Sequence, residues 1–360
     1  MEFGESLKNT FGTYDKILEQ KPIITLYVNE EAKYIFLLHE NKMEVNIKIK
    51  SVFLRKTTSD FHKSRNNKNH YDIYVYENHI DTPTRLVLDK IHEMSRDFAR
   101  DIRKWMIDVY FLPASRSGIY TGMSSFGPIM AQLSQNRAYF NRSFQIPSIP
   151  EPISDYYMAL SSIKLDRSVR FEEIAHEIEE TILNGEVKFD SRQKALTYHG
   201  KTMEHASEMN DVSSMVSEIS PIVAYLKYIV RAGNARTRGK KAASIIFIEE
   251  PEAHLHPFNQ IKLMKIFTTL SKLNIKLIMA SHSNYVFNEL NNRVLAGELD
   301  KDTYSPVLMK WEDGKSNTYY MNMDEFGVQD SNFADASELL YDEREGLVLR
   351  LMERMENENK

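Results

Sequence analysis

The amino-terminal part of the chain alternates apolar stretches of strand length with polar turns. β-branched and aromatic residues concentrate in four segments, Pro22–Val28, Lys33–His39, Met43–Leu54 and His70–Tyr76. Turns rich in Asn, Glu and Lys separate these segments, which predicts an antiparallel β meander. From Thr84 to Val109 the apolar positions recur every three or four residues. This change of period predicts an amphipathic helix that runs into a short strand at Asp108–Pro113.

Helical periodicity resumes in the middle of the chain. The apolar pattern predicts helices at Phe126–Phe140, Pro152–Ile163 and Phe171–Leu183. Asn184 and Gly185 form a turn signal that ends the last of these helices. We expect a short strand immediately afterwards, at Glu186–Phe189.

Helices and apolar strands alternate regularly in the last 150 residues. Strands that are separated by helices indicate βαβ units and therefore a parallel sheet. A hairpin turn at Asp313-Gly314 and a charged terminal helix are expected to close the chain. The expected elements are helices at Ser214–Val230, Asn259–Leu273 and Asn284–Leu290, and strands at Ser244–Ile248 and Lys276–Ala280.

Composition and charge narrow the class of protein. The 360 residues are 42% hydrophobic and 27% charged, with a net charge of −5, which is typical of a folded protein. A protein that coats nucleic acid is usually basic, so any DNA contact would be a local patch. The absence of cysteine excludes disulfides and thiolate metal sites. Neither a signal peptide nor an apolar run of membrane length occurs, so we expect a soluble, cytoplasmic protein without a membrane partner.

Two adjacent acids follow the most apolar strand of the chain. Ser244–Ile248 runs into Glu249 and Glu250, and α/β folds bind ligands at the carboxyl edge of a parallel sheet. Neighbouring residues on a strand point in opposite directions, so Glu249 could hold the hydration shell of Mg²⁺ while Glu250 faces a water to be activated. The next strand ends in Ser281-His282-Ser283, which would place His282 on the same edge.

These motifs resemble those of ABC-type ATPases, in the group that contains the RecF, OLD and SMC-like proteins. The segment Glu-Glu-Pro-Glu-Ala-His-Leu-His-Pro, Glu249–Pro257, is similar to their Walker B end and D-loop. Ala280–Ser283 resembles the switch-histidine segment. Val212–Glu218 resembles a degenerate ABC signature without its usual glycine, and Tyr110–Gly118 resembles an element found between the Walker A region and the signature.

The resemblance implies roles for the matched residues. Glu249 would help to bind Mg²⁺ through water, and Glu250 would be the general base for ATP hydrolysis. His282 would sense the γ-phosphate of ATP, and the start of the signature helix would contact nucleotide held by an opposing protomer. Three residues would therefore contribute to nucleotide binding, Ser214, Glu218 and His256.

The resemblance also implies an α/β fold with a mixed or parallel sheet of ABC-ATPase type, an antiparallel β subdomain and a helical subdomain. The expected divisions are a start segment at 1–21, the antiparallel β subdomain at 22–82, a helix and core strand at 83–124, the helical subdomain at 125–185, the ATPase core with signature, Walker B, D-loop and switch histidine at 186–345, and the end of a C-terminal helix at 346–360.

The phosphate-binding loop of such an ATPase is missing from the sequence. The motif G-x-x-x-x-G-K-[ST], whose amides and lysine hold phosphates, does not occur. Gly122–Gly127, Gly200–Thr202 and Gly314–Ser316 imitate parts of it, and each is expected to be a turn. The chain is therefore expected to begin just after the P-loop helix. Its expected partner is a second copy in a homodimer or a companion polypeptide that carries a P-loop.

Three further interpretations stay open. A non-hydrolysing regulatory or interaction module could share the fold. His254 and His256, with Glu249, Glu250 and His282, are also the ligand types of a Zn²⁺ or Mn²⁺ site, which would indicate a metal-dependent hydrolase. Two basic stretches could follow a DNA backbone, as part of genome maintenance or phage defence, although a solvated loop explains such charges equally well. These stretches are Arg55–His70 and Arg231–Lys241.

Overall fold

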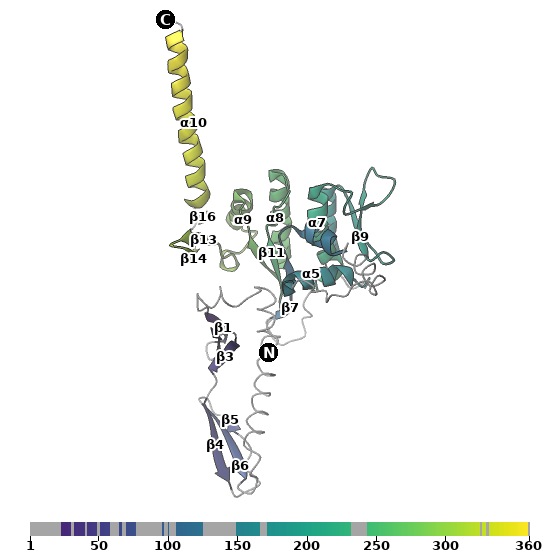
Figure 1. Ribbon diagram of the computed structural model, residues 1–360, viewed down its shortest axis with the longest axis vertical. Coiled ribbons are helices and arrows are strands. Elements are labelled where there is room, and N and C mark those ends of the chain that lie inside the picture. The colour runs from purple at the N-terminus through teal and green to yellow at the C-terminus, as the bar shows by residue number, and fades with distance from the viewer. Residues whose placement is uncertain are drawn as a thin grey trace, which may run out of the picture.

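The computed structural model is shown in Figure 1. It describes residues 23–29, 32–39, 42–48, 51–57, 65–66, 70–76, 96, 100, 106–124, 149–165, 171–231, 243–324, 326–328 and 331–358. The predicted helix at Phe126–Phe140 lies outside these residues, as do most of the predicted helix at Thr84–Val109 and the basic stretch after Arg231.

A three-stranded parallel sheet forms the centre of the described chain. Its order is β12 (Ile275–Ala280), β11 (Ala243–Glu249) and β7 (Met106–Leu112), and both neighbours of β11 run parallel to it. The mixed α/β class and the parallel sheet predicted from the sequence are confirmed. The helix predicted at Thr84–Val109 extended too far, because Met106 already begins β7. At the end of this segment the helical period overlaps an apolar run of strand length. Pairing with β11 makes these residues a strand rather than a helix.

Helices pack beside this sheet around one hydrophobic core. They are α5 (Glu151–Ser161), α6 (Glu172–Ile178), α7 (Ser214–Ala224), α8 (Pro257–Lys272) and α9 (Asn284–Leu295). α8 packs against β12 and α9, and α6 contacts both α7 and α8 (Figure 1). The core includes Phe267, Ile219 and Leu263, which are buried almost completely. The helices predicted at these places from the apolar period are therefore confirmed.

Two of the helices change to a wider turn before they end. α6 continues as the π-helical segment Glu179–Leu183, and α7 continues as the π-helical segment Tyr225–Ile229. The first ends at Asn184, which has a φ of 52°. This left-handed residue occupies the place where the sequence predicted a break.

An antiparallel sheet follows the first π-helical segment. It consists of β8 (Gly185–Asp190), β9 (Ala195–Gly200) and β10 (Ser207–Glu208) in the order β10-β9-β8. A Cβ on Gly185 would lie 2.6 Å from the carbonyl oxygen of His199, so the close strand pairing requires glycine. Lys201 and Thr202 form a turn after β9, as expected for this imitation of a P-loop.

The amino-terminal strands form two separate sheets. β1 (Ile23–Asn29), β2 (Ala32–His39) and β3 (Lys42–Lys48) make the predicted antiparallel meander. The single strand predicted at Met43–Leu54 is wrong, because the chain divides it between β3 and the next sheet. That sheet holds β4 (Ser51–Thr57), β5 (Arg65–Asn66) and β6 (His70–Tyr76), in the order β4-β6-β5, and β4 pairs with β6 in parallel. A strand period does not reveal the direction of pairing.

The carboxyl-terminal part consists of a hairpin, a small ribbon and a long helix. β13 (Val307–Glu312) and β14 (Lys315–Tyr320) form the predicted hairpin with a turn at Asp313-Gly314. A 3-10 turn (Lys301–Thr303) precedes them, and β15 (Met323–Asp324) and β16 (Gly327–Val328) follow. α10 (Ser331–Glu358) extends away from the other described elements (Figure 1).

One local expectation differs from the structure. The fragment Gly122–Gly127 was expected to be a turn, but its described residues, 122–124, are helical. None of the helices in the described part of the chain is long and apolar enough to cross a membrane.

We expect Gly327→Ala to destabilise the carboxyl-terminal ribbon by at least about 2 kcal/mol. Gly327 has a φ of 99°, and an added Cβ would overlap the side chain of Asn291. That side chain accepts a hydrogen bond from the Val328 N–H (2.9 Å) and donates one to the Val328 carbonyl (3.3 Å). Thermal unfolding measures the effect. Gly297→Ala is the matched control, since Gly297 has a φ of 69° in open space; equal losses for both variants would contradict the overlap.

Candidate functional site

The three parallel strands end at a common edge, where the backbone takes unusual conformations. Glu249 is the last residue of β11 and pairs with Ala280, the last residue of β12. The chain then leaves the strand, because Glu250 has a φ of 42°, and its N–H donates to the Ala280 carbonyl at 2.8 Å. Ser115, just after β7, and His254 also have positive φ values, 54° and 60°. Such conformations cost energy and concentrate at functional sites.

The two adjacent carboxylates differ in their surroundings. Glu249 is exposed, and one oxygen, Oε2, accepts a hydrogen bond from the Ala114 N–H at 3.1 Å. Glu250 is half-buried. Because Glu250 is outside the strand, simple strand alternation does not set its direction, although the two side chains still belong to the same edge.

His282 lies one strand away, two residues after β12. Its side chain is exposed, and its backbone N–H donates to Oε1 of Glu252 at 2.8 Å. The other oxygen of Glu252 is buried and has no hydrogen-bond partner among the described residues. Ser283 caps α9 and donates to the side-chain carbonyl of Gln260 at 2.5 Å. The segments after β11 and β12 are thus tied together, although 30 residues separate them.

Arg116 connects this edge to the signature-like helix. Its side chain is fully buried. The guanidinium donates to the carbonyls of Glu249 (2.7 Å), Glu250 (3.2 Å), Glu218 (3.0 Å) and Pro113 (3.3 Å). Burial lowers the pKa of Arg116 below its ordinary value, while the charges of Glu218, Glu252 and Glu250 act in the opposite direction. The group nevertheless remains charged, since arginine does not lose its proton in proteins.

The signature-like segment places its predicted residues differently. Ser213 caps α7 by accepting a hydrogen bond from the Val216 N–H at 3.4 Å, and Ser214 is exposed at the first helical position. Glu218 is only 2% exposed. Its Oε1 accepts hydrogen bonds from the hydroxyl (2.6 Å) and N–H (3.2 Å) of Ser117, and its Oε2 lies 3.5 Å from Arg116 Nε. The carboxylate of Glu218 therefore points into the protein rather than towards solvent.

His256 lies at the start of α8 and is exposed. Its Nδ1 accepts a hydrogen bond from the Phe258 N–H at 3.4 Å, so that the imidazole caps the helix. The ring also stacks on Phe258, with centroids 5.5 Å apart. These contacts explain a histidine here through helix capping, independently of a ligand.

The structure brings no transition-metal site together. All five side chains of the metal-site interpretation lie in the described part of the chain, and within that part no group of three or more His, Asp or Glu side chains could hold a metal ion. Mg²⁺ needs less from the protein, since it keeps several waters and binds one or two carboxylates beside phosphate oxygens. The exposed carboxylate of Glu249, with one oxygen used by a backbone N–H, fits that requirement.

Sequence reasoning missed the residues that hold the edge together. Arg116 lay within the quoted element Tyr110–Gly118 without a role, and Glu252 lay within the D-loop segment. An arginine placed four residues after the end of a strand was a signal that could have been followed. Ser117 and Gln260 carried no such signal, because their partners are distant in sequence.

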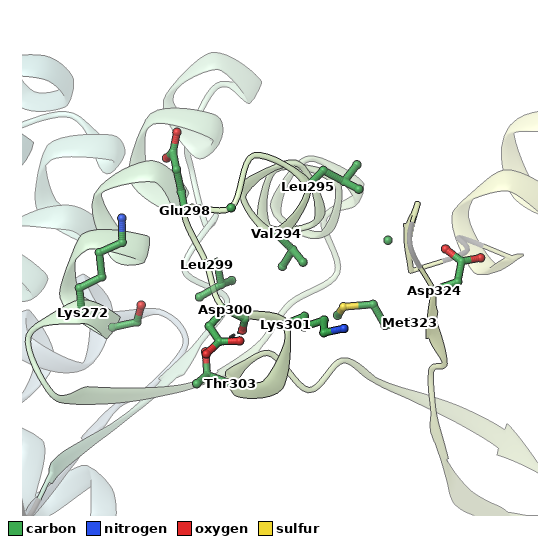
Figure 2. A pocket seen from close by; sticks show the side chains of 13 residues that line it. Lys272, Val294, Leu295, Glu298, Leu299, Asp300, Lys301, Thr303, Met323 and Asp324 are labelled. Atoms are coloured by element: carbon green, nitrogen blue, oxygen red, sulfur yellow. Dashed lines mark hydrogen bonds between the residues drawn. The ribbon is translucent and has the colours of Figure 1, made fainter.

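A separate hollow of about 920 Å³ lies away from this edge (Figure 2). It is formed by the ends of α8 and α9, by the 3-10 turn and by β15 and β16. Lys272, Lys301, Glu298 and Asp324 line it together with apolar side chains such as Leu299. None of the predicted site residues lines it.

Comparisons with known proteins indicate the family of this chain. A family model described as an AAA ATPase domain matches residues 2–287. No curated protein sequence matches the chain. Similar solved structures include one described under ATP-driven dimerization and DNA-stimulated activation of SMC ATPases, with 10% identity, a TM-score of 0.31 and coverage of 53% of this chain and 96% of that chain.

Two further solved structures are similar. An SMC head domain from Thermotoga maritima has 11% identity and a TM-score of 0.29, and the match covers 47% of this chain and 52% of that one. An SMC head bound to the C-winged helix domain of ScpA has 11% identity and a TM-score of 0.28, with coverage of 50% and 48%. The present chain thus spans about half the length of these two structures.

The described chain is an α/β protein whose parallel sheet carries acids at its carboxyl edge, and its sequence contains no recognisable Walker A motif. The chain belongs to the AAA ATPase domain family, because the family model covers well over half of it. The family resemblance stated from the sequence is thereby confirmed.

Proposed function

We propose that this chain supplies the Walker B, signature and switch parts of an ABC-type ATPase. A phosphate-binding loop from another polypeptide or protomer completes its nucleotide-binding site. One observation carries the proposal. Glu249 at the end of β11, Glu250 just after it and His282 just after β12 lie at the same edge of two neighbouring parallel strands. Ligand-binding edges of α/β sheets have this position.

Each residue of the edge has a distinct task in this proposal. Glu250 takes the proton from the attacking water. Its half-buried position restricts the solvation of its carboxylate. Glu249 holds the water shell of Mg²⁺, which supplies charge neutralisation for the phosphates when bound. The exposed ring of His282 contacts the terminal phosphate. Its backbone is held in place by Glu252.

The start of α7 serves an opposing protomer. Ser214 is exposed at the amino-terminal end of this helix, where unpaired N–H groups favour an anion. Glu218 contributes by holding the helix to Arg116 and Ser117 rather than by touching the nucleotide. His256, exposed at the start of α8, lies on the D-loop side of the same edge. Nucleotide at a head-to-head interface would use these exposed groups.

The proposed partner is either a second copy or a companion polypeptide with a P-loop. The proposal also includes coupling of ATP hydrolysis to engagement with DNA or with an effector, in genome maintenance or phage defence. The missing G-x-x-x-x-G-K-[ST] motif favours the companion, since ATP binding needs a phosphate cradle. The same absence favours a second candidate, a non-hydrolysing regulatory module of this fold.

Calorimetric titration with a slowly hydrolysed ATP analogue and Mg²⁺ tests the proposal. We expect no measurable binding to the isolated chain, and binding at about −8 kcal/mol, a micromolar Kd, once a companion polypeptide that carries a P-loop is added. The same titration with AMP is the control for nonspecific heat. Micromolar binding by the chain alone would show that another loop replaces the P-loop. Absence of binding in both cases would contradict the ATPase proposal and favour the regulatory module.

A further inference from the structure

Arg116 carries a charge in a fully buried position, which requires a structural explanation. Its side chain is 0% exposed, and among the described residues its only charge partner within ion-pair distance is Glu218 at 3.5 Å. A buried ion pair is weak evidence for stability, because apolar residues of similar volume often serve as well or better. The geometry of the contacts, rather than their energy, therefore distinguishes this arginine.

The guanidinium joins three chain segments that are far apart in sequence. One end nitrogen, Nη1, donates to the carbonyls of Pro113 and Glu249, and the other, Nη2, donates to the carbonyl of Glu250. Nε donates to the carbonyl of Glu218 on α7. Only a planar fork with several donors can reach carbonyls in these directions at once, and a lysine ammonium cannot.

The carbonyls that Arg116 holds belong to the two acids of the site. Glu249 and Glu250 are the residues at which the chain leaves β11 and turns into the left-handed conformation. Fixing both of their carbonyls fixes the peptide between them, and hence the directions in which the two side chains leave the backbone. Arg116 touches neither carboxylate in a hydrogen bond, so its influence on them is indirect.

Glu218, which Arg116 contacts on α7, lies one helical turn from the exposed start of that helix. Glu218 follows Ser214 by four residues, and both its carbonyl and its carboxylate are engaged by the segment Arg116-Ser117. The Tyr156 hydroxyl donates to the Arg116 carbonyl at 3.0 Å, which supports the same segment from α5. A displacement of α7 would therefore move Arg116 and, through it, the peptide of Glu249 and Glu250.

We propose that Arg116 is a positioning residue that couples the start of α7 to the orientation of Glu249 and Glu250. The consequence for catalysis rests on the ATPase function proposed above, whereas the mechanical link does not. In an ATPase assembly, nucleotide contact at Ser214 of one protomer would thus be transmitted within that protomer to its own acidic edge.

Hydrogen exchange of the full chain tests the link without nucleotide. We expect Arg116→Lys to speed exchange of the Glu250 and Ala253 amides about tenfold, because those amides lie in the turn that the fork holds. Exchange at the start of α7 should change less, since lysine keeps a charge for Glu218. Glu218→Gln, made at the opposite end, should also speed exchange of the Glu250 amide about threefold or more.

Arg293→Met is the matched control, because Arg293 makes comparable ion pairs with Glu289 (2.8 Å) and Glu298 (3.1 Å) at the far end of α9. It should lower the unfolding midpoint without a selective change at Glu250. A merely structural Arg116 would speed exchange everywhere in proportion to lost stability. That uniform pattern, or an unchanged Glu250 amide in Glu218→Gln, would overturn the link.

Steady-state kinetics of ATP hydrolysis separates this inference from the proposed function. In an assembly that hydrolyses ATP, Arg116→Lys should lower kcat about tenfold and leave KM within about twofold, because it alters the reacting geometry rather than binding. Equal changes in both parameters would overturn the catalytic consequence. If the wild-type assembly does not hydrolyse ATP, the proposed function fails, while the exchange result still decides the link.

Discussion

Lys227→Met should lower the free energy of unfolding by about 3–5 kcal/mol, because it leaves a buried carboxylate without its charge partner. Lys227 Nζ lies 2.8 Å from Oε1 of Glu179 and also donates to the Val187 carbonyl at 3.1 Å. Glu179 is only 2% exposed, and its Oε1 accepts a hydrogen bond from the Val187 N–H. The pair joins the two π-helical segments to β8. Urea unfolding followed by circular dichroism measures the loss.

A second substitution provides the control for this prediction. In the Lys227→Met background, Glu179→Gln removes the unpaired charge and keeps an acceptor for the Val187 N–H, so it should recover at least about 1 kcal/mol. A loss below about 1 kcal/mol in the single variant would contradict the importance of the pair.

Glu250→Gln is expected to lower the rate of ATP hydrolysis by the assembled enzyme about 10²- to 10⁴-fold, because glutamine cannot accept the proton of the attacking water. The substitution keeps the size of the side chain, and the backbone contact of Glu250 with Ala280 is unaffected. Nucleotide binding should persist, so that ATP stays trapped in the assembly. Single-turnover phosphate release and retention of labelled ATP measure the two effects.

Glu173→Gln is the matched control for this substitution. Glu173 is an exposed acid in the first turn of α6, and its change should leave turnover within about twofold, as surface substitutions usually do. If Glu250→Gln also hydrolyses ATP at the wild-type rate, Glu250 is not the general base. The neighbouring Glu249 would then be the next carboxylate to test.

Local periodicity was sufficient to predict most of the carboxyl-terminal elements. β11, α8, β12 and α9 carry their own apolar periods, and α9 is also preceded by a capping serine, Ser283. The same approach was weaker where two patterns overlap or where pairing is non-local. Met106 fitted a helical period but lies in β7, and the direction in which β4 pairs with β6 depends on residues beyond either strand.

The candidate site was predictable only in part. Glu249, Glu250 and His282 were predicted to lie at one edge because they stand at or just beyond the ends of apolar strands, and parallel strands end at one edge. Glu218 also matched a motif, but its burial against Arg116 and Ser117 gives it an internal role. The left-handed turn at Glu250 was not visible either, since glutamate carries no signal for a positive φ.

The amino-acid sequence by itself determined the βαβ order, the acids and histidine at the sheet edge, and the absence of a phosphate-binding motif, because all of these are encoded in neighbouring residues. Only the tertiary structure decided which side chains hold that edge in place. Arg116 meets carbonyls of residues 102 to 134 positions away. Contacts of this kind arise where α7 and the end of β11 meet the segment that follows β7, and no local pattern specifies them.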